Sequence, residues 1–305
     1  MTIDEALLRH LYKYDRTLPL LATSESEPVM DPVTLQPLDG LRRERVTFAS
    51  THDERVLATL TYPATGGPFA AVILQHGSTP LGRHSWAQRA AGPIHQAWAQ
   101  AGLMTVAVDA YGFGSRESPD DRGRLRTGRP DLLFRTRDQR MQAIQDLMRT
   151  VDYLNDRADV RRDAIGFLGI SMGCRIGVPF FALDRRVGAG AFFVGGSAPY
   201  SRFEVAGTDF ADLAVDEQLA FELTDPITFA PLTGGRPAFM ANGTRDVLVT
   251  REGGERLQSA LAEPKTLRWF DGGHGESPPE LFEEARAFLA AHLGATVGAK
   301  AGAAV

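Results

Sequence analysis

The stretch "IGFLGISMGCRIG", from Ile165 to Gly177, places a serine between two glycines where one sequence pattern gives way to another. The residues before Ser171 are apolar at successive positions, as in a strand covered on both faces, and those after it follow a helical pattern. Gly169 and Gly173 complete the pattern G-x-S-x-G. We expect glycine there because a Cβ two residues to either side of the serine would collide with the other arm of a tight turn. The stretch therefore predicts a strand-turn-helix unit that lifts the Ser171 hydroxyl above a sheet.

Strand and helix patterns alternate along most of the chain. The predicted strands lie at 71–75, 104–109, 164–170, 188–195, 237–243 and 265–270, and the helical patterns cover about 86–101, 137–155, 172–184, 251–262 and 279–292. Two β-rich runs after Arg42, "RVTFAS" and "RVLATLTYP", flank the turn-prone "THDE" and predict an antiparallel hairpin. The alternation predicts an α/β fold with a doubly wound, mostly parallel sheet flanked by helices.

Composition limits the classes of function. The 305 residues are 43% hydrophobic with a formal net charge of −5, which gives no overall positive charge for a nucleic-acid partner. Cys174 is the single cysteine, so the chain can form neither an intramolecular disulfide nor a cysteine-rich metal site. The N-terminus lacks a secretory pattern, and no apolar run is long enough to span a bilayer. We therefore expect a cytoplasmic protein that does not enter the membrane.

The chain divides into an arm, a domain and a tail. Residues 1–40 start with a short helical pattern and continue through several prolines, which predicts an irregular arm. The arm could pack on the body or contact a neighbouring subunit of a homo-oligomer, and the sequence leaves both open. Residues 41–294 form the predicted domain, and residues 295–305 the predicted flexible tail.

Two connections are longer than α/β units need. The segment 196–236 is predicted to be an inserted lid. The segment 114–134 is rich in arginine, and it could form part of a pocket entrance or a solvated loop with internal ion pairs. Its arginines are Arg116, Arg122, Arg124, Arg126 and Arg129, and the acidic residues available to pair with them are Glu117, Asp120, Asp121 and Asp131.

Three chemically matched side chains follow the ends of predicted strands. Ser171, Asp246 and His274 occur in the order serine, aspartate, histidine. A serine hydroxyl needs a base to take its proton, and the imidazole needs a carboxylate to fix its tautomer. Asp271 competes with Asp246 for the carboxylate role. We assign it instead to capping the glycine turn around His274, because the acid reaches the histidine most easily from a separate loop.

Backbone amides near Ser171 are candidates for an oxyanion hole. Met172 starts the helix after the serine, and its N–H is the first predicted donor. The second is the N–H of Ser78, with Thr79 as the alternative, because "QHGS" follows directly on a buried strand. His76 is predicted to brace that loop by hydrogen bonds. His84 could line the pocket, while the remaining histidines are predicted to have surface or packing roles: His10, His52, His95 and His292.

With these motifs the chain resembles the α/β-hydrolase superfamily, and in particular its dienelactone-hydrolase-like and acetyl-esterase-like members. The matching pieces are "QHGS", "DAYGFGSRES", "GFLGISMG", "DPITFAP", "RPAFMANGTRD" and "FDGGHG". The resemblance implies a sheet of about eight strands, a Ser-His-Asp triad, no metal or organic cofactor, and hydrolysis of an ester or related acyl bond. Two departures stand out. Cys174 replaces a frequent second glycine and suits burial, and Pro179 should shorten or kink the helix after the serine.

The leading hypothesis is a carboxylesterase that acts on small or medium esters through an acyl-enzyme on Ser171. An oligopeptidase-like peptidase would use the same triad, although such proteins usually carry a large additional domain. Thioesterase, lactonase and acyltransferase activities also stay open. A non-catalytic binding protein on the same fold is the alternative from another class, and it would commonly have lost a triad residue or an elbow glycine.

Overall fold

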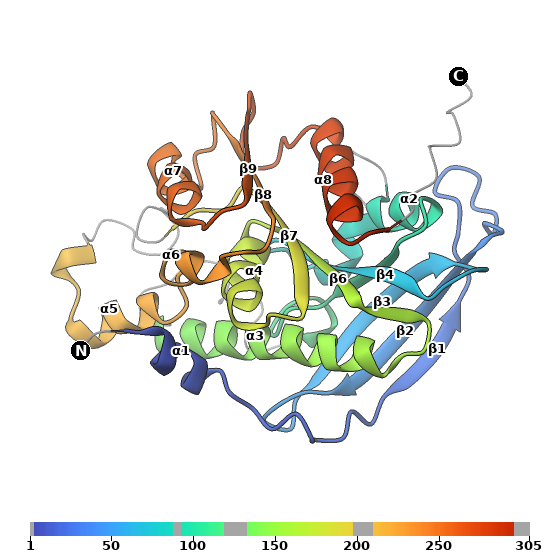
Figure 1. Ribbon diagram of the computed structural model, residues 1–305, viewed down its shortest axis with the longest axis horizontal. Helices are drawn as coiled ribbons and strands as arrows, with labels where there is room; N and C mark the ends of the chain where they lie inside the picture. Colours follow the sequence, from blue (N-terminus) through green and yellow to red (C-terminus); the bar gives the residue numbers. More distant parts are fainter. Residues whose placement is uncertain (1–2, 88–92, 119–132, 198–209, 296–305) are drawn as a thin grey trace.

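The computed structural model describes residues 3–87, 93–118, 133–197 and 210–295, and within them the chain forms a nine-stranded sheet (Figure 1). The strands are β1 (Thr23–Glu27), β2 (Leu41–Ala49), β3 (Arg55–Pro63), β4 (Phe69–Gln75), β5 (Met104–Val108), β6 (Val160–Ile170), β7 (Val187–Phe193), β8 (Ala238–Gly243) and β9 (Lys265–Phe270). Their order is β1-β2-β3-β5-β4-β6-β7-β8-β9. The pairs β1-β2, β2-β3 and β3-β5 are antiparallel, and the six strands β4 to β9 run parallel to one another. The predicted doubly wound, mostly parallel sheet is confirmed.

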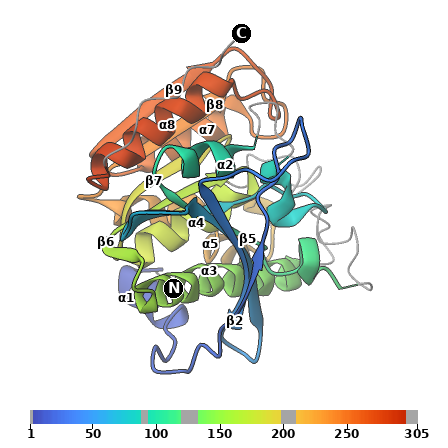
Figure 2. The ribbon, with the colours of Figure 1, turned by 90° about the vertical axis from the view of Figure 1, so that its right-hand side faces the viewer.

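Helices cover both faces of the sheet. They are α1 (Glu5–Leu11), α2 (Ile94–Gln100), α3 (Leu133–Asp156), α4 (Met172–Leu183), α5 (Val215–Glu222), α6 (Pro226–Phe229), α7 (Arg251–Ala260) and α8 (Pro279–His292). Figure 2 shows α3 on one side of the sheet and α2 with α8 on the other. None of the described helices combines the length and apolar character that crossing a membrane requires.

The helix predicted over 86–101 differs from the observed one. Trp86 and Ala87 belong to a 3₁₀ helix, η1 (Gly82–Ala87), and α2 begins only at Ile94. Pro93 stands at the N-cap of α2, where its missing N–H costs nothing, whereas a proline inside a helix would break the hydrogen-bond ladder. The proline therefore sets the start of α2.

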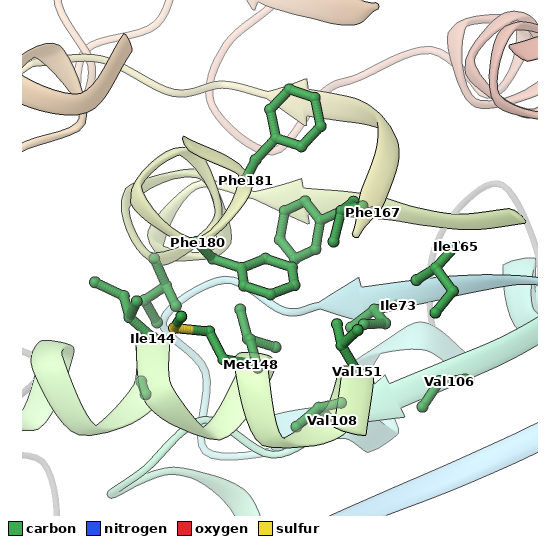
Figure 3. Close-up of a cluster of buried hydrophobic side chains, with 14 of the residues drawn as sticks. Ile73, Val106, Val108, Ile144, Met148, Val151, Ile165, Phe167, Phe180 and Phe181 are labelled. Atoms are coloured by element: carbon green, nitrogen blue, oxygen red, sulfur yellow. The ribbon is translucent and has the colours of Figure 1, made fainter. Parts of the chain in front are cut away.

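The main core lies between the sheet and the helices α3 and α4. Figure 3 shows aromatic and branched side chains from the two helices meeting those of the central strands. Phe167 of β6 packs edge-to-face on Phe180 of α4, with ring centroids 5.5 Å apart. A second apolar cluster joins the opposite face of the sheet to α2 and α8. Both faces of the central strands are thus buried, as their unbroken apolar runs predict.

The N-terminal arm packs on the body. Leu8 and Tyr12 are 2% and 1% exposed, and the Tyr12 hydroxyl donates to the carbonyl of Leu223 at 2.7 Å. The arm also contains β1, an antiparallel edge strand that the sequence analysis did not expect. Its residues, "TSESE", are all polar, so they carry no hydrophobic periodicity, and Glu25 and Glu27 put charge on the exposed edge. The arm thus has the helical start that was expected, α1, but its continuation is not irregular throughout as predicted.

The predicted lid lies partly within the described residues. Residues 210–236 form η5 (Phe210–Asp212), α5, α6 and η6 (Ala230–Thr233), and α5 and α6 pack against α3 and α4. Residues 198–209 of the segment lie outside the described residues, as do 119–132 of the arginine-rich segment and 296–305 of the tail. Whether 196–236 acts as a lid stays a prediction.

Candidate active site

Ser171 joins β6 to α4 in a tight turn with an uncommon backbone conformation. Its φ is 55° and its ψ is −114°, backbone angles that residues other than glycine rarely adopt. Its N–H donates to the carbonyl of Phe193 on β7 at 2.9 Å, and its own carbonyl accepts from the Cys174 N–H at 2.8 Å. These bonds hold the serine at the carboxyl edge of the parallel strands, where α/β sheets place their ligands.

The two glycines of the motif are required by close packing. A Cβ built on Gly169 would overlap with the carbonyl of Gly173, which is the predicted collision between the two arms of the turn. A Cβ on Gly173 would overlap instead with the carbonyl of Gln75 at the end of β4. The second glycine thus lets α4 approach the neighbouring strand, and the predicted collision with the other arm of the turn was wrong for Gly173.

Ser171, His274 and Asp246 form one hydrogen-bonded chain. The distance from His274 Nε2 to Ser171 Oγ is 2.7 Å, and that from His274 Nδ1 to Asp246 Oδ2 is 2.7 Å. An ionised carboxylate only accepts hydrogen bonds, so Nδ1 carries the proton and Nε2 is left to accept from the serine hydroxyl. The structure therefore brings together the three residues that the sequence analysis selected, with the imidazole in the tautomer that a general base needs.

The Asp246 carboxylate is held on both oxygens. Oδ1 accepts from the N–H groups of Leu248 at 2.8 Å and Val249 at 2.9 Å, while Oδ2 faces His274. Burial by itself would raise the pKa of Asp246, but the hydrogen bonds from His274 and from the two amides outweigh it. The pKa therefore lies below its usual value, and the side chain is charged at neutral pH.

Asp271 has a different role from the one predicted. Its side chain is 85% exposed and forms an ion pair with Arg245, with Nε and Oδ1 2.9 Å apart. The glycine turn before His274 is capped by Glu276, whose Oε2 accepts from the Gly273 N–H at 2.6 Å. Glu276 approaches from the far side of the turn, so the expected cap by Asp271 was wrong.

The loop after β4 lies against Ser171. A Cβ built on Gly77 would stand 3.4 Å from the Cβ of Ser171, so the backbone next to Ser78 borders the nucleophile. His76 braces this loop as predicted. Its Nε2 accepts from the Ala110 N–H at 3.1 Å, so Nδ1 carries the proton and donates to the Gly77 carbonyl at 2.7 Å. The choice of Ser78 over Thr79 as the donor stays a prediction.

Comparisons with solved structures show which fold the chain shares. An acetyl xylan esterase from Paenibacillus sp. superposes with a TM-score of 0.66 and 18% identity over 95% of this chain and 100% of its own. Acetyl xylan esterase 1 from Thermoanaerobacterium sp. gives 0.66 and 15% over 95% and 98%. A cold-adapted esterase from an Arctic intertidal metagenomic library gives 0.63 and 19% over 84% and 96%. The chain has the α/β-hydrolase fold.

Comparisons by sequence match a smaller part of the chain than comparisons by structure. No family model matches the chain. A curated Bacillus subtilis (strain 168) protein named "Putative hydrolase YtaP" is 28% identical over 130 residues, which is 40% of this chain and 42% of that protein. The match to this relative therefore spans less than half of its length.

In this α/β-hydrolase fold the two departures from the expected pattern lie inside the body. Cys174 is fully buried, with Sγ 2.9 Å from the Phe193 carbonyl, and burial raises its thiol pKa far above the usual value. Helix α4 continues through Pro179 to Leu183, so the proline does not shorten it, and the alternative, a kink at the proline, stays a prediction. The neighbouring side chains of Val178 and Phe180 are fully buried, and this packing outweighs the missing backbone hydrogen bond.

The other described histidines lie apart from the hydrogen-bonded chain at Ser171. His52 contacts Gln142, with Nδ1 2.8 Å from Oε1. His95 contacts Arg43, and burial together with that guanidinium lowers the pKa of His95 to about 4, so the ring is neutral. His84 lies in η1 with an exposed side chain. Within the part of the chain that the structure describes, no group of three or more His, Cys, Asp or Glu residues could hold a metal ion.

Arg116 is not free to line a pocket entrance. Its side chain is 5% exposed, its Nη1 lies 2.6 Å from Asp146 Oδ2, and its Nη2 lies 3.5 Å from Glu54 Oε2. These are not the acidic neighbours that the sequence analysis considered. The pairing partners come from α3 and from the β2–β3 turn, so only the folded chain brings them to Arg116.

Sequence reasoning missed the buried ion pair of Arg83 with Asp109. The pair lies between the loop after β4 and the loop after β5, and its side chains are 4% and 0% exposed. Asp109 comes directly after a buried strand and opens the quoted piece "DAYGFGSRES". A carboxylate at the end of a buried parallel strand was therefore the available signal, although its partner 26 residues earlier could not be identified.

Proposed function

We propose that the protein is a serine esterase that hydrolyses carboxylic esters of small or medium size. The observation that carries the proposal is the continuous chain from Ser171 through His274 to Asp246, with both hydrogen bonds at 2.7 Å. This arrangement activates a serine hydroxyl for attack on an acyl carbon. Three of the solved structures that share the fold are named as esterases, which favours ester substrates over other acyl compounds.

The proposed reaction proceeds through an acyl-enzyme. Ser171 Oγ attacks the ester carbonyl while His274 Nε2 takes the hydroxyl proton, and the same proton passes to the departing alcohol. Water then attacks the acyl carbon while His274 Nε2 takes one of its protons. The bond from the acyl carbon to Ser171 Oγ breaks as His274 returns that proton to Oγ, and the carboxylic acid is released. Asp246 stabilises the imidazolium throughout. The oxyanion of each tetrahedral intermediate would be held by the N–H groups of Met172, at the positive end of α4, and Ser78.

Peptidase, thioesterase and lactonase activities would use the same atoms. A non-catalytic binding protein is disfavoured, because binding alone requires neither the strained Ser171 backbone nor an imidazole aligned between serine and carboxylate. Strain of this kind persists where the surrounding structure maintains it, commonly at functional sites. The proposed partner is therefore a small-molecule ester.

The proposal is tested with p-nitrophenyl acetate and a fluorophosphonate label. The wild-type protein should hydrolyse the ester and take up one label, which peptide mapping should place on Ser171. Ser171→Ala should lose both properties, whereas Ser259→Ala, an exposed serine on α7, should keep both. No hydrolysis of any ester, together with no labelling, would refute the proposal. A panel of esters, thioesters and lactones of graded acyl length then separates the activities that share the triad.

A further inference from the structure

The ion pair of Arg83 and Asp109 joins two loops at the carboxyl edge of the sheet. The Asp109 carboxylate contacts the Arg83 guanidinium through Oδ2 and accepts from the Arg83 backbone N–H through Oδ1 at 2.7 Å. The same Oδ2 accepts from the Ser115 backbone N–H at 3.1 Å. One buried carboxylate therefore binds the start of η1, in the loop after β4, and the start of η2 (Gly114–Arg116), in the loop after β5.

The two loops close tightly around this carboxylate. Gly82 and Gly114 both have positive φ, at 53° and 59°, and a Cβ on either would overlap with Asp109 Oδ1. Arg83 is held further by Nε, which donates to Thr59 at 3.1 Å, and by Nη1, which donates to Ser115 Oγ at 2.9 Å. The packing leaves the loops little room to shift while the carboxylate is in place.

The proposed oxyanion donor, Ser78, lies in the segment from His76 to Arg83, and the ion pair of Arg83 and Asp109 holds one end of this segment. At the other end, His76 Nε2 accepts from the N–H of Ala110, which directly follows Asp109 in the chain. The segment from His76 to Arg83 is therefore fixed at both ends to the chain that follows β5. Ser78 lies between these anchors, and the Gly77 backbone borders Ser171.

We infer that Asp109 is a positioning residue for the oxyanion hole, acting through Arg83 and the start of η1 on the N–H of Ser78. The inference rests on the proposed esterase function. An oxyanion donor is effective only within about 2.7–3.1 Å of the developing negative charge. A shift of the segment below 1 Å would therefore weaken binding of the transition state and leave substrate binding nearly unchanged.

Asp109→Asn tests this inference, with Asp184→Asn as the matched control. Asn keeps the size of the side chain but loses the negative charge and one acceptor. Asp184 is also fully buried and paired with an arginine, Arg186, but it follows α4 at the opposite edge of the sheet. Both variants lose a buried charge, while only Asp109 contacts the segment that carries Ser78.

The measurements are kcat and KM for p-nitrophenyl acetate, the Ki of a trifluoromethyl ketone that forms a tetrahedral adduct, and urea unfolding. Asp109→Asn should lower kcat about 10-fold to 100-fold with KM within about threefold, and Ki should rise by the same factor as kcat falls. The pH profile should keep its wild-type midpoint, because His274 and Asp246 are unaltered. Asp184→Asn should lose stability and keep kcat and Ki within about twofold.

Unchanged kcat and Ki in Asp109→Asn would overturn the inference, as would an equal loss in Asp184→Asn. If Asp109→Asn does not fold, Arg83→Lys retains the charge but loses the contacts to Thr59 and Ser115. This variant should show a smaller parallel change in kcat and Ki, about threefold to tenfold, and no change would again overturn the inference. An inactive, unlabelled wild-type protein would instead refute the proposed function.

Discussion

Replacing Asp246 by Asn changes the hydrogen-bonding direction at one atom and leaves the shape of the site intact. The Asn oxygen can still accept from the amides of Leu248 and Val249, as Oδ1 does now at 2.8 and 2.9 Å. The NH₂ group then occupies the place of Oδ2, 2.7 Å from His274 Nδ1. Because NH₂ is a donor, Nδ1 must accept and Nε2 takes the proton, so the ring can no longer act as a base for Ser171.

We expect kcat to fall by about 10³ to 10⁴, which corresponds to about 4 to 5.5 kcal/mol of transition-state stabilisation. The assay is steady-state hydrolysis of p-nitrophenyl acetate, with circular dichroism and urea unfolding to establish that the variant is folded. Asp271→Asn is the control, since this carboxylate is 85% exposed and pairs only with Arg245 among the described contacts. It should keep kcat within about twofold and stability within about 0.5 kcal/mol.

A folded Asp246→Asn variant with kcat within tenfold of wild type would refute the reasoning about the tautomer. A large loss in Asp271→Asn, with Asp246→Asn active, would show that the histidine takes its partner from its own loop. A parallel loss in both variants would point to a general disturbance of the loops around His274, and unfolding curves would reveal it as a shared loss of stability.

Three further perturbations have outcomes that the structure fixes. Gly173→Ala places a Cβ over a carbonyl of β4 and should cost more than about 2 kcal/mol of unfolding free energy in urea, together with most of the activity. Burial by itself would raise the pKa of Glu44, but hydrogen bonds from Arg157 and a tyrosine lower it to about 2. The stability that Glu44 contributes is present above the unfolded pKa of about 4.3 and is lost as pH falls toward 2, so unfolding free energies of wild type and Glu44→Gln should differ at pH 7 and converge near pH 2. Tyr12→Phe removes the hydrogen bond to the Leu223 carbonyl and should lower stability by about 1 kcal/mol in urea unfolding; an unchanged midpoint would show that α1 is held by apolar contacts alone.

The elements that the sequence predicted well are those whose signal is local. Ser171 stands between a continuous apolar run and a helical pattern, Asp246 follows the buried strand β8, and His274 follows the last strand, β9. Parallel strands place their carboxyl ends at one edge of the sheet, so the chain order alone brings these three residues near one another. The hydrogen-bond distances between them were beyond any such pattern.

The features that the sequence did not reveal depend on contacts between distant segments or on polar residues. Strand β1 is polar throughout, and it is a strand because β2 pairs with it, not because its own side chains favour burial. Arg116 pairs with Asp146, which is 30 residues away on α3, although nearer acidic residues were available in the sequence. A buried charged side chain pairs with an opposite charge that the fold places next to it, which can be far away in the sequence. The order of charges along the sequence therefore does not predict which residues form a buried ion pair.

The backbone of Ser171 leads to a last prediction. A residue with a Cβ at φ 55° and ψ −114° is strained by about 1 to 3 kcal/mol, whereas glycine accepts positive φ without that penalty. Glycine costs about 0.5 to 1 kcal/mol through its greater freedom in the unfolded chain, so the relief of strain should exceed this cost. Ser171→Gly should therefore be more stable than Ser171→Ala by about 1 kcal/mol in urea unfolding, with both variants inactive. If Ser171→Ala proved the more stable of the two, the turn would not be strained. The Ser171 backbone conformation would then not lower the stability of the fold.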